Sequence, residues 1–137
     1  MVRLGEKIIL GLVEKIAILG EKKVEATALF DTGARLTSVD IKLASKAQLG
    51  PIVRITQVKN PSFNRLIKRP VVRAKIKIKD KVFDADVNIQ DRSHMTFPVI
   101  IGRNIITGNF IIDPTINRDL YKQERINFEK ERNSAGI

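Results

Sequence analysis

The sequence has no cysteine and no tryptophan, and aromatic residues make up only 5% of its 137 positions. Without cysteine the chain has neither a disulfide framework nor a thiolate metal site. With so few aromatic side chains, the core has to be built from Ile, Val, Leu and Ala. A chain of this length is expected to form one domain with a sizeable hydrophobic core.

Long hydrophobic runs are missing as well. No apolar segment approaches the roughly 18 to 20 residues that a membrane-spanning helix needs. Glu6, Glu14 and Lys15 interrupt the apolar N-terminal segment, which argues against a signal peptide. The sequence therefore predicts a soluble, cytoplasmic protein without a membrane partner.

Positive charge is in excess, and most of it lies in one part of the chain. The formal net charge is +10, and residues 54–81 alone hold ten Lys and Arg residues against a single Asp. Such a stretch favours acidic partners, either acidic peptides or the phosphates of a nucleic acid. The alternative is a solvated surface with no partner.

The pattern of residue types predicts mostly β-structure. Strands are expected at 7–19, 24–30, 52–59, 97–102 and 109–113. Asp40 is a typical N-cap for a short helix over 41–50, and a single helical turn is expected at 103–108. The Pro- and Asn-containing segment 60–70 is interpreted as a mobile loop. The predicted fold class is all-β, a small closed barrel over residues 1–117 with one or two short helices. A charged tail over 118–137 follows the barrel, and it is a helix, an interface arm or disordered.

The clearest local signal is an alternating hairpin between residues 71 and 89. Apolar side chains alternate with Lys and Arg in its first half and with Asp in its second half. A turn at Asp80-Lys81 would place Lys77 opposite Asp84 and Lys75 opposite Asp86. The remaining cations of the basic stretch, Arg54, Lys59, Arg65, Lys68 and Arg69, lie outside this hairpin.

Asp31 ends an apolar run and is followed at once by Thr32, Gly33 and Ala34. Asp and Gly are ordinary turn residues, so the triplet alone favours a turn aspartate in an inert barrel. The other interpretation is a catalytic carboxylate held by its own loop. One such carboxylate needs a second to activate a water molecule.

Two motifs together support the catalytic interpretation. The segments ALFDTGA and FPVIIGRNII resemble those of retropepsin-like aspartic peptidases, in which an Asp-Thr/Ser-Gly loop comes early and a strand ending in Gly packs behind it. Here Ile100, Ile101 and Gly102 supply that strand, and Gly102 lies 71 positions after Asp31. The sequence is most similar to a microbial branch often labelled "ATP-dependent zinc protease", which also shows DTGAR and a segment like DRSHMTFPVIIGRN. The resemblance covers residues 8–115.

The resemblance implies a role for each residue of the loop. Asp31 would supply the catalytic carboxylate, and Thr32 would brace the loop through its hydroxyl group. Gly33, Ala34 and Gly102, with Ile101 before it, would allow the backbones to approach closely. No second Asp-Thr/Ser-Gly occurs in the chain. A symmetric homodimer would therefore bring two Asp31 residues to one water molecule, where like charges share one proton.

The chain also departs from the viral members of this family. Segment 56–70, in the place of their Gly-rich flap, contains no glycine, and Arg35 stands where they carry an acidic residue. His94 is the only histidine, and there is no HExxH motif, so neither a catalytic zinc nor another cofactor is expected. The candidate substrate-binding residues are Arg35, Arg65, Lys68, Arg69 and His94.

Two functions follow from these patterns. The first is an aspartic endopeptidase acting on peptides, with acidic peptides as the favoured class because microbial relatives often occur near ligases that add acidic residues to proteins. The alternative is an inactive basic β-barrel that binds acidic protein or nucleic acid. Nucleic acid is the less expected partner, because Phe63 is the only aromatic residue of the basic stretch that could stack on a base.

Overall fold

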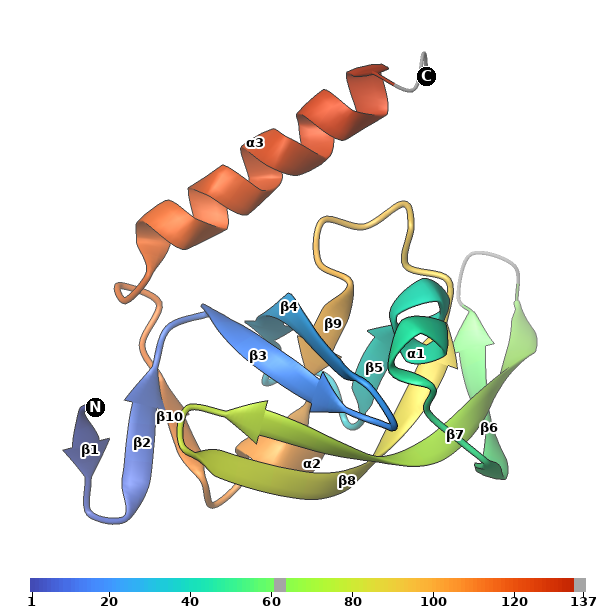
Figure 1. Ribbon diagram of the computed structural model, residues 1–137, viewed down its shortest axis with the longest axis horizontal. Helices are drawn as coiled ribbons and strands as arrows, with labels where there is room; N and C mark the ends of the chain where they lie inside the picture. The colour runs from blue at the N-terminus through green and yellow to red at the C-terminus, as the bar shows by residue number, and fades with distance from the viewer. Residues whose placement is uncertain (61–63, 135–137) are drawn as a thin grey trace.

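The computed structural model describes residues 1–60 and 64–134, and Phe63 therefore lies outside the described residues. Its strands are β1 (Arg3–Leu4), β2 (Lys7–Leu10), β3 (Val13–Leu19), β4 (Lys23–Phe30), β5 (Thr37–Asp40), β6 (Ile52–Asn60), β7 (Arg65–Ile78), β8 (Lys81–Gln90), β9 (Val99–Ile101) and β10 (Phe110–Ile112). Its helices are α1 (Ile41–Ala47), α2 (Arg103–Ile106) and α3 (Arg118–Ser134). Figure 1 shows their arrangement.

Six strands close into a barrel in the order β3-β4-β9-β5-β8-β7, and β7 pairs back onto β3. The β4–β9 and β5–β8 pairs are parallel and the others are antiparallel, so the barrel is mixed. The predicted class, a mostly β closed barrel with short helices, is confirmed. Strand β6 lies outside the six-strand barrel and pairs with the first part of β7. Strands β1, β2 and β10 form a separate small sheet.

The interior of the barrel is aliphatic, as the scarcity of aromatic residues requires. Its fully buried side chains include Ile18, Phe30, Val39, Ile76, Ile78, Val87 and Ile101. Each such side chain contributes about 1.5–3 kcal/mol relative to an exposed one. This core surrounds the ends of β4 and β9, and so it fixes the backbone on which the Asp31 loop is built.

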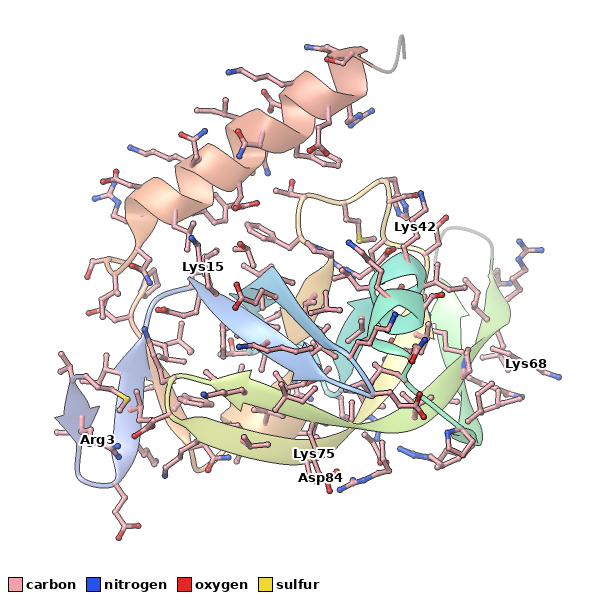
Figure 2. All side chains as sticks on the ribbon, viewed as in Figure 1. Arg3, Lys15, Lys42, Lys68, Lys75 and Asp84 are labelled. Atoms are coloured by element: carbon pink, nitrogen blue, oxygen red, sulfur yellow. The ribbon has the colours of Figure 1, made fainter. Side chains whose placement is uncertain are left out.

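The β7–β8 hairpin exists, but its predicted register is wrong by two residues. The turn is at Lys79-Asp80, and Lys75 lies opposite Asp84 (Figure 2). The shift by two leaves every side chain on its predicted face, because strand faces alternate with a period of two. The carboxylates of Asp84 and Asp86 form ion pairs with arginines instead of with Lys75 and Lys77. Arg73 contacts Asp84 at 3.1 Å and Asp86 at 3.0 Å, and Arg54 contacts Asp86 at 3.0 Å.

The mobile loop predicted at 60–70 is also wrong over its described part. Residues 65–70 are the first part of β7, and they pair with β6 from Asn60 back to Ile55. Pro70, which suggested a loop, sits where the edge of the sheet tolerates a missing N–H group. Residues 61–63 lie outside the described residues. The β6–β7 pair therefore forms a long hairpin that projects beyond the barrel (Figure 1).

Helix α1 begins as predicted, with the Asp40 carboxylate accepting a hydrogen bond from Lys42 N at 3.0 Å. The charged tail forms α3, none of whose residues is buried. Figure 1 shows α3 lying beside the barrel. It contacts the barrel through the ring of Tyr121, 5.6 Å from that of Phe97, and through Glu124, which accepts from the Thr27 hydroxyl at 3.2 Å. Over the described ranges, no helix combines the length and the apolar character that crossing a bilayer requires.

Candidate active site

Asp31 is the first residue after β4, and its backbone is tied to the neighbouring strand. Asp31 N donates to the carbonyl of Ile101 at 2.8 Å, which continues the β4–β9 ladder by one bond. The Asp31 side chain is half-buried, and its Oδ1 accepts from Gly33 N at 2.8 Å. The carboxylate is thus held by its own loop and still reaches solvent.

The loop after Asp31 is a tight turn. Ala34 N donates to the Asp31 carbonyl at 3.1 Å. A Cβ atom at Gly33 would lie 3.2 Å from Asp31 Oδ1, so a side chain there would press on the carboxylate. Small residues at positions 33 and 34 therefore keep the carboxylate in place and accessible.

Gly102 passes directly beneath this loop. A Cβ atom at Gly102 would lie 2.6 Å from the carbonyl carbon and oxygen of Leu36, and 2.9 Å from the carbonyl oxygen of Ala34. Arg103 N then donates to the Ala34 carbonyl at 2.8 Å, and Asn104 N donates to the Arg35 carbonyl at 3.2 Å. The strand and the loop are therefore joined by backbone hydrogen bonds over a gap that only glycine fits.

The side chains of Thr37 and Asn104, to which the sequence motifs assign no role, connect the loop to the barrel. The Thr37 hydroxyl donates to Asn104 Oδ1 at 2.9 Å and accepts from Gly102 N at 3.1 Å. Asn104 Oδ1 also accepts from Thr37 N at 3.0 Å, and its Nδ2 donates to the Asp86 carbonyl at 2.8 Å. Asn104 lies within the quoted segment FPVIIGRNII and Thr37 follows DTGAR by two positions, but neither residue was assigned a role.

The hydroxyl of Thr37 is fully buried and braces Gly102 and Asn104, whereas the bracing role that the resemblance implied for the hydroxyl of Thr32 stays a prediction. Thr32 is exposed, and its carbonyl oxygen accepts from Arg103 Nη1 at 3.1 Å. Arg103 is therefore engaged within its own chain, on the loop that carries Asp31.

A cavity of about 460 Å³ lies between the Asp31 loop and the β6–β7 hairpin. Its lining residues are Ala34, Arg35, Leu36, Ser38, Thr56, Gln57, Lys59, Arg69, Asn88, Gln90, Arg92 and Ile100. Two of the candidate substrate-binding residues, Arg35 and Arg69, belong to this lining. The lining does not include the other three candidates, Arg65, Lys68 and His94. Asp31 lies beside the cavity, three residues before the lining residue Ala34. Among the described lining residues, four are cationic and none is acidic.

Arg92 was not a candidate, yet it is the most deeply placed cation of the cavity. Its side chain is only 6% exposed, and its Nε donates to the Phe97 carbonyl at 2.9 Å. Burial lowers the pKa of Arg92, and the positive charge of Arg69 lowers it further, while the carboxylates of Asp40 and Asp31 act in the opposite direction.

The lining of the cavity combines the aliphatic residues Leu36 and Ile100 with a buried polar group. The Ser38 hydroxyl donates to Asn88 Oδ1, and Gln90 Nε2 donates to the Ser38 hydroxyl at 2.9 Å. Ser38 and Asn88 are buried, and they are register partners across the parallel β5–β8 pair. An apolar ligand would leave this polar group poorly solvated, so the cavity fits a polar or anionic ligand.

The zinc implied by the label of the microbial branch does not fit the residues. His94 is exposed, and within the described ranges no three His, Cys, Asp or Glu side chains are grouped to hold a metal ion. Asp91, in the same loop, accepts from Ser93 N at 2.9 Å, and hydrogen bonds from Ser93 lower the pKa of its carboxyl group. The Asp91 carboxylate therefore stabilises the turn at Ser93.

Residues 41–123 match the model of the RimB-like family, described as retropepsin-like aspartic endopeptidase RimB. The chain belongs to this family. The match begins after the Asp-Thr-Gly triplet, so the membership does not rest on that short motif. It includes Arg92, Gly102 and Asn104. No protein among those with curated descriptions matches the chain significantly.

Solved structures support the retropepsin-like fold of this RimB-like chain. Lpg0085, a protein of unknown function from Legionella pneumophila, is 28% identical, with a TM-score of 0.55 over 79% of this chain and 94% of that one. The EIAV protease, solved with the inhibitor HBY-793, is 17% identical with a TM-score of 0.55 over 69% and 83% of the two chains. The simian foamy virus protease is 14% identical, with a TM-score of 0.51 over 67% and 88%.

We expect Thr37→Val to lower the free energy of unfolding by about 1–3 kcal/mol, because it leaves the buried Gly102 N–H and one Asn104 interaction unsatisfied while preserving shape. Urea denaturation measures this change. Thr107→Val, at an exposed threonine just after α2, is the matched control and should change stability by less than about 0.5 kcal/mol. Equal effects of the two substitutions would remove Thr37 from its bracing role.

Proposed function

We propose that this RimB-like protein is an aspartic endopeptidase that works as a homodimer, with Asp31 of each subunit at one shared site. The observation that carries the proposal is the crossing of Gly102 beneath the Asp31 loop, which holds a half-buried carboxylate accessible at the edge of a cavity. A turn aspartate in an inert barrel would not need this close approach. Membership of the RimB-like family supports the same reaction class.

The homodimer is proposed because a single chain offers one carboxylate where two are needed. The chain has one Asp-Thr-Gly triplet. In the described part of the chain, the hydrogen bond made by the Asp31 carboxylate comes from Gly33 N, and no other carboxylate is paired with it. A two-fold axis beside the loop would supply the partner group from the same residue of a second copy.

The reaction then follows from two carboxylates that share one proton. The ionised Asp31 takes a proton from a water molecule as that water attacks the carbonyl carbon of the peptide bond. The protonated Asp31 of the other subunit donates to the developing oxyanion. The tetrahedral intermediate then collapses, the C–N bond breaks, and the amine leaves with a proton returned by the dyad.

Acidic peptides are the proposed substrate class. Arg35, Arg69 and Arg92 all line the cavity beside Asp31, and guanidinium groups bind carboxylates through paired hydrogen bonds. The described lining contains no acidic residue that would repel such a peptide. The polar group of Ser38, Asn88 and Gln90 offers hydrogen bonds in the same lining.

Asp31→Asn should reduce cleavage of a fluorogenic glutamate-rich peptide by at least about 1,000-fold, because an amide cannot take the proton from water. The thermal unfolding temperature should stay close to that of the unchanged protein, since the Asn side-chain oxygen can still accept from Gly33 N. Asp119→Asn, on the exposed first turn of α3, is the matched control and should retain full activity. Unchanged cleavage by Asp31→Asn would remove Asp31 from the mechanism.

The proposed preference for acidic peptides predicts different effects at two adjacent residues of β7. Arg69 lines the cavity, whereas Lys68 points outward from the hairpin (Figure 2). Arg69→Gln should raise the KM for a glutamate-rich peptide about tenfold, through loss of a charge-assisted hydrogen bond. The KM for the same peptide with Gln in place of Glu should hardly change. Lys68→Gln should leave both values unchanged, and an equal rise with Lys68→Gln would show that only net charge matters.

A further inference from the structure

A second basic surface lies on the outer side of the barrel, across β4, β3 and β7. Four lysines from these strands and one from the turn after β7 make up this surface, here called the lysine face: Lys15, Lys23, Lys75, Lys77 and Lys79. Lys77 lies opposite Ala17 on β3, and Lys75 lies opposite Leu19, which in turn lies opposite Lys23 on β4. The sequence places these lysines up to 64 positions apart, and barrel closure brings them together.

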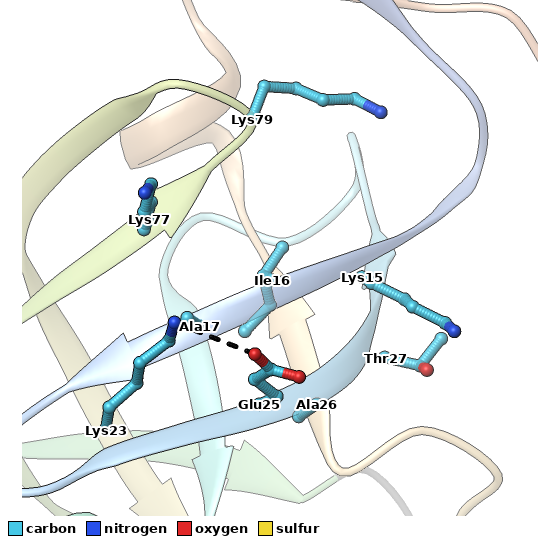
Figure 3. A pocket seen from close by; sticks show the side chains of 9 residues that line it. All are labelled: Lys15, Ile16, Ala17, Lys23, Glu25, Ala26, Thr27, Lys77 and Lys79. Atoms are coloured by element: carbon cyan, nitrogen blue, oxygen red, sulfur yellow. Dashed lines mark ion pairs between the residues drawn. The ribbon is translucent and has the colours of Figure 1, made fainter.

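The lysine face surrounds a shallow hollow of about 450 Å³ (Figure 3). Its floor is Ala17, whose small side chain leaves space between the strands, together with Ile16. Lys15, Lys23, Lys77 and Lys79 stand around it, with Glu25 as the only acidic lining residue. The hollow shares no lining residue with the cavity beside Asp31.

Much of this positive charge is not neutralised. Lys79 contacts the buried carboxylate of Glu14 at 3.1 Å, and Lys23 contacts Glu25 at 3.7 Å. Lys75 faces Asp84, but that carboxylate is engaged by Arg73 at 3.1 Å. Among the described residues, no carboxylate lies within ion-pair distance of Lys15, Lys75 or Lys77. The lysine face therefore presents three free ammonium groups and a weakly paired fourth.

The two basic surfaces differ in the cation that they use. The cavity beside Asp31 carries three arginines, which suit the flat, bidentate geometry of carboxylates. The lysine face has no arginine and no aromatic residue in its lining, so its charges act as compact, strongly hydrated point charges. Such charges attract phosphate groups without a fixed bidentate geometry, which is sufficient for contacts with a phosphate backbone that do not depend on sequence.

We propose that the lysine face binds the phosphate backbone of double-stranded nucleic acid without sequence preference, a function beyond the proposed peptidase activity. Residues at every second position of one strand recur about 6.6–6.8 Å apart on the same face, so Lys75 and Lys77 form a short row of charges, and Lys79 follows in the turn after β7. A row of this kind can follow successive phosphates, which supply most of the non-specific affinity in such complexes. The shallow hollow leaves room for a broad ligand.

A duplex fits better than a single strand. Single-strand binding relies on aromatic side chains that stack on bases, and the lining of the hollow has none. The scarcity of stacking residues also made nucleic acid the less expected partner in the sequence, but that expectation concerned only base stacking in the basic stretch. Contact with duplex phosphates needs no stacking, and it uses Lys15 and Lys23 from outside that stretch.

The test is fluorescence anisotropy with a labelled 20-base-pair RNA duplex and a DNA duplex of the same sequence, titrated with the full chain between 50 and 200 mM salt. We expect binding to both duplexes. The variant with Lys15→Gln, Lys75→Gln and Lys77→Gln should bind at least tenfold more weakly at the lowest salt. Its slope of log K against log salt should be shallower by about 2–3, because each phosphate contact adds about 0.9 to the slope.

The matched control removes the same three charges elsewhere, with Lys46→Gln, Lys122→Gln and Lys130→Gln on exposed positions of α1 and α3. It should lose less than threefold in affinity. The proposal is overturned if the unchanged protein does not bind either duplex, or if the two triple variants differ by less than threefold. It is also overturned if a glutamate-rich peptide binds the lysine face more tightly than the duplexes do. Cleavage of a short peptide should be equal in both triple variants, which separates this proposal from the peptidase proposal.

Discussion

The close approach of Gly102 to the loop after Asp31 is the constraint on which the rest of the site depends. The strand can pass beneath Leu36 and Ala34 only because position 102 has no side chain. That approach lets Gly102 N reach the Thr37 hydroxyl and lets Arg103 N reach the Ala34 carbonyl. The loop is then held from below by hydrogen bonds, and the Asp31 carboxylate stays at the surface without support from other side chains. A preorganised carboxylate of this kind is what water activation requires.

The distribution of the cations gives the molecule two different basic surfaces. Arginines line the cavity beside Asp31, and Arg92 is held there by burial and by its bond to the Phe97 carbonyl. Lysines cover the outer side of β3, β4 and β7. Aspartates on β8 form ion pairs with Arg73 and Arg54, which belong to the lining of neither surface. In this view the net charge of +10 is divided between a surface for carboxylates and a surface for phosphates.

The fold class and the Asp31 loop could be predicted because their signals are local. Alternation gave the hairpin, the Asp-Thr-Gly and Ile-Ile-Gly segments gave the family, and Asp40 gave the start of α1. The features that were missed depend on contacts between distant parts of the chain. The hairpin register depends on which cation captures Asp84 and Asp86, and charge pairing alone favoured Lys75 and Lys77 over Arg73 and Arg54. The roles of Thr37, Asn104 and Arg92 depend on tertiary contacts among β5, α2 and the loop after β8. No spacing of residues in the sequence indicates these contacts.

The central claim is that two copies of Asp31 share one catalytic site. The most direct measurement is calorimetric titration of the protein with a glutamate-rich peptide in which a hydroxyethylene group replaces the scissile amide. Such a peptide mimics the tetrahedral intermediate and has to contact both carboxylates at once. The account predicts one bound peptide for every two chains, with binding lost in Asp31→Asn. A stoichiometry of one peptide for each chain would contradict a shared site.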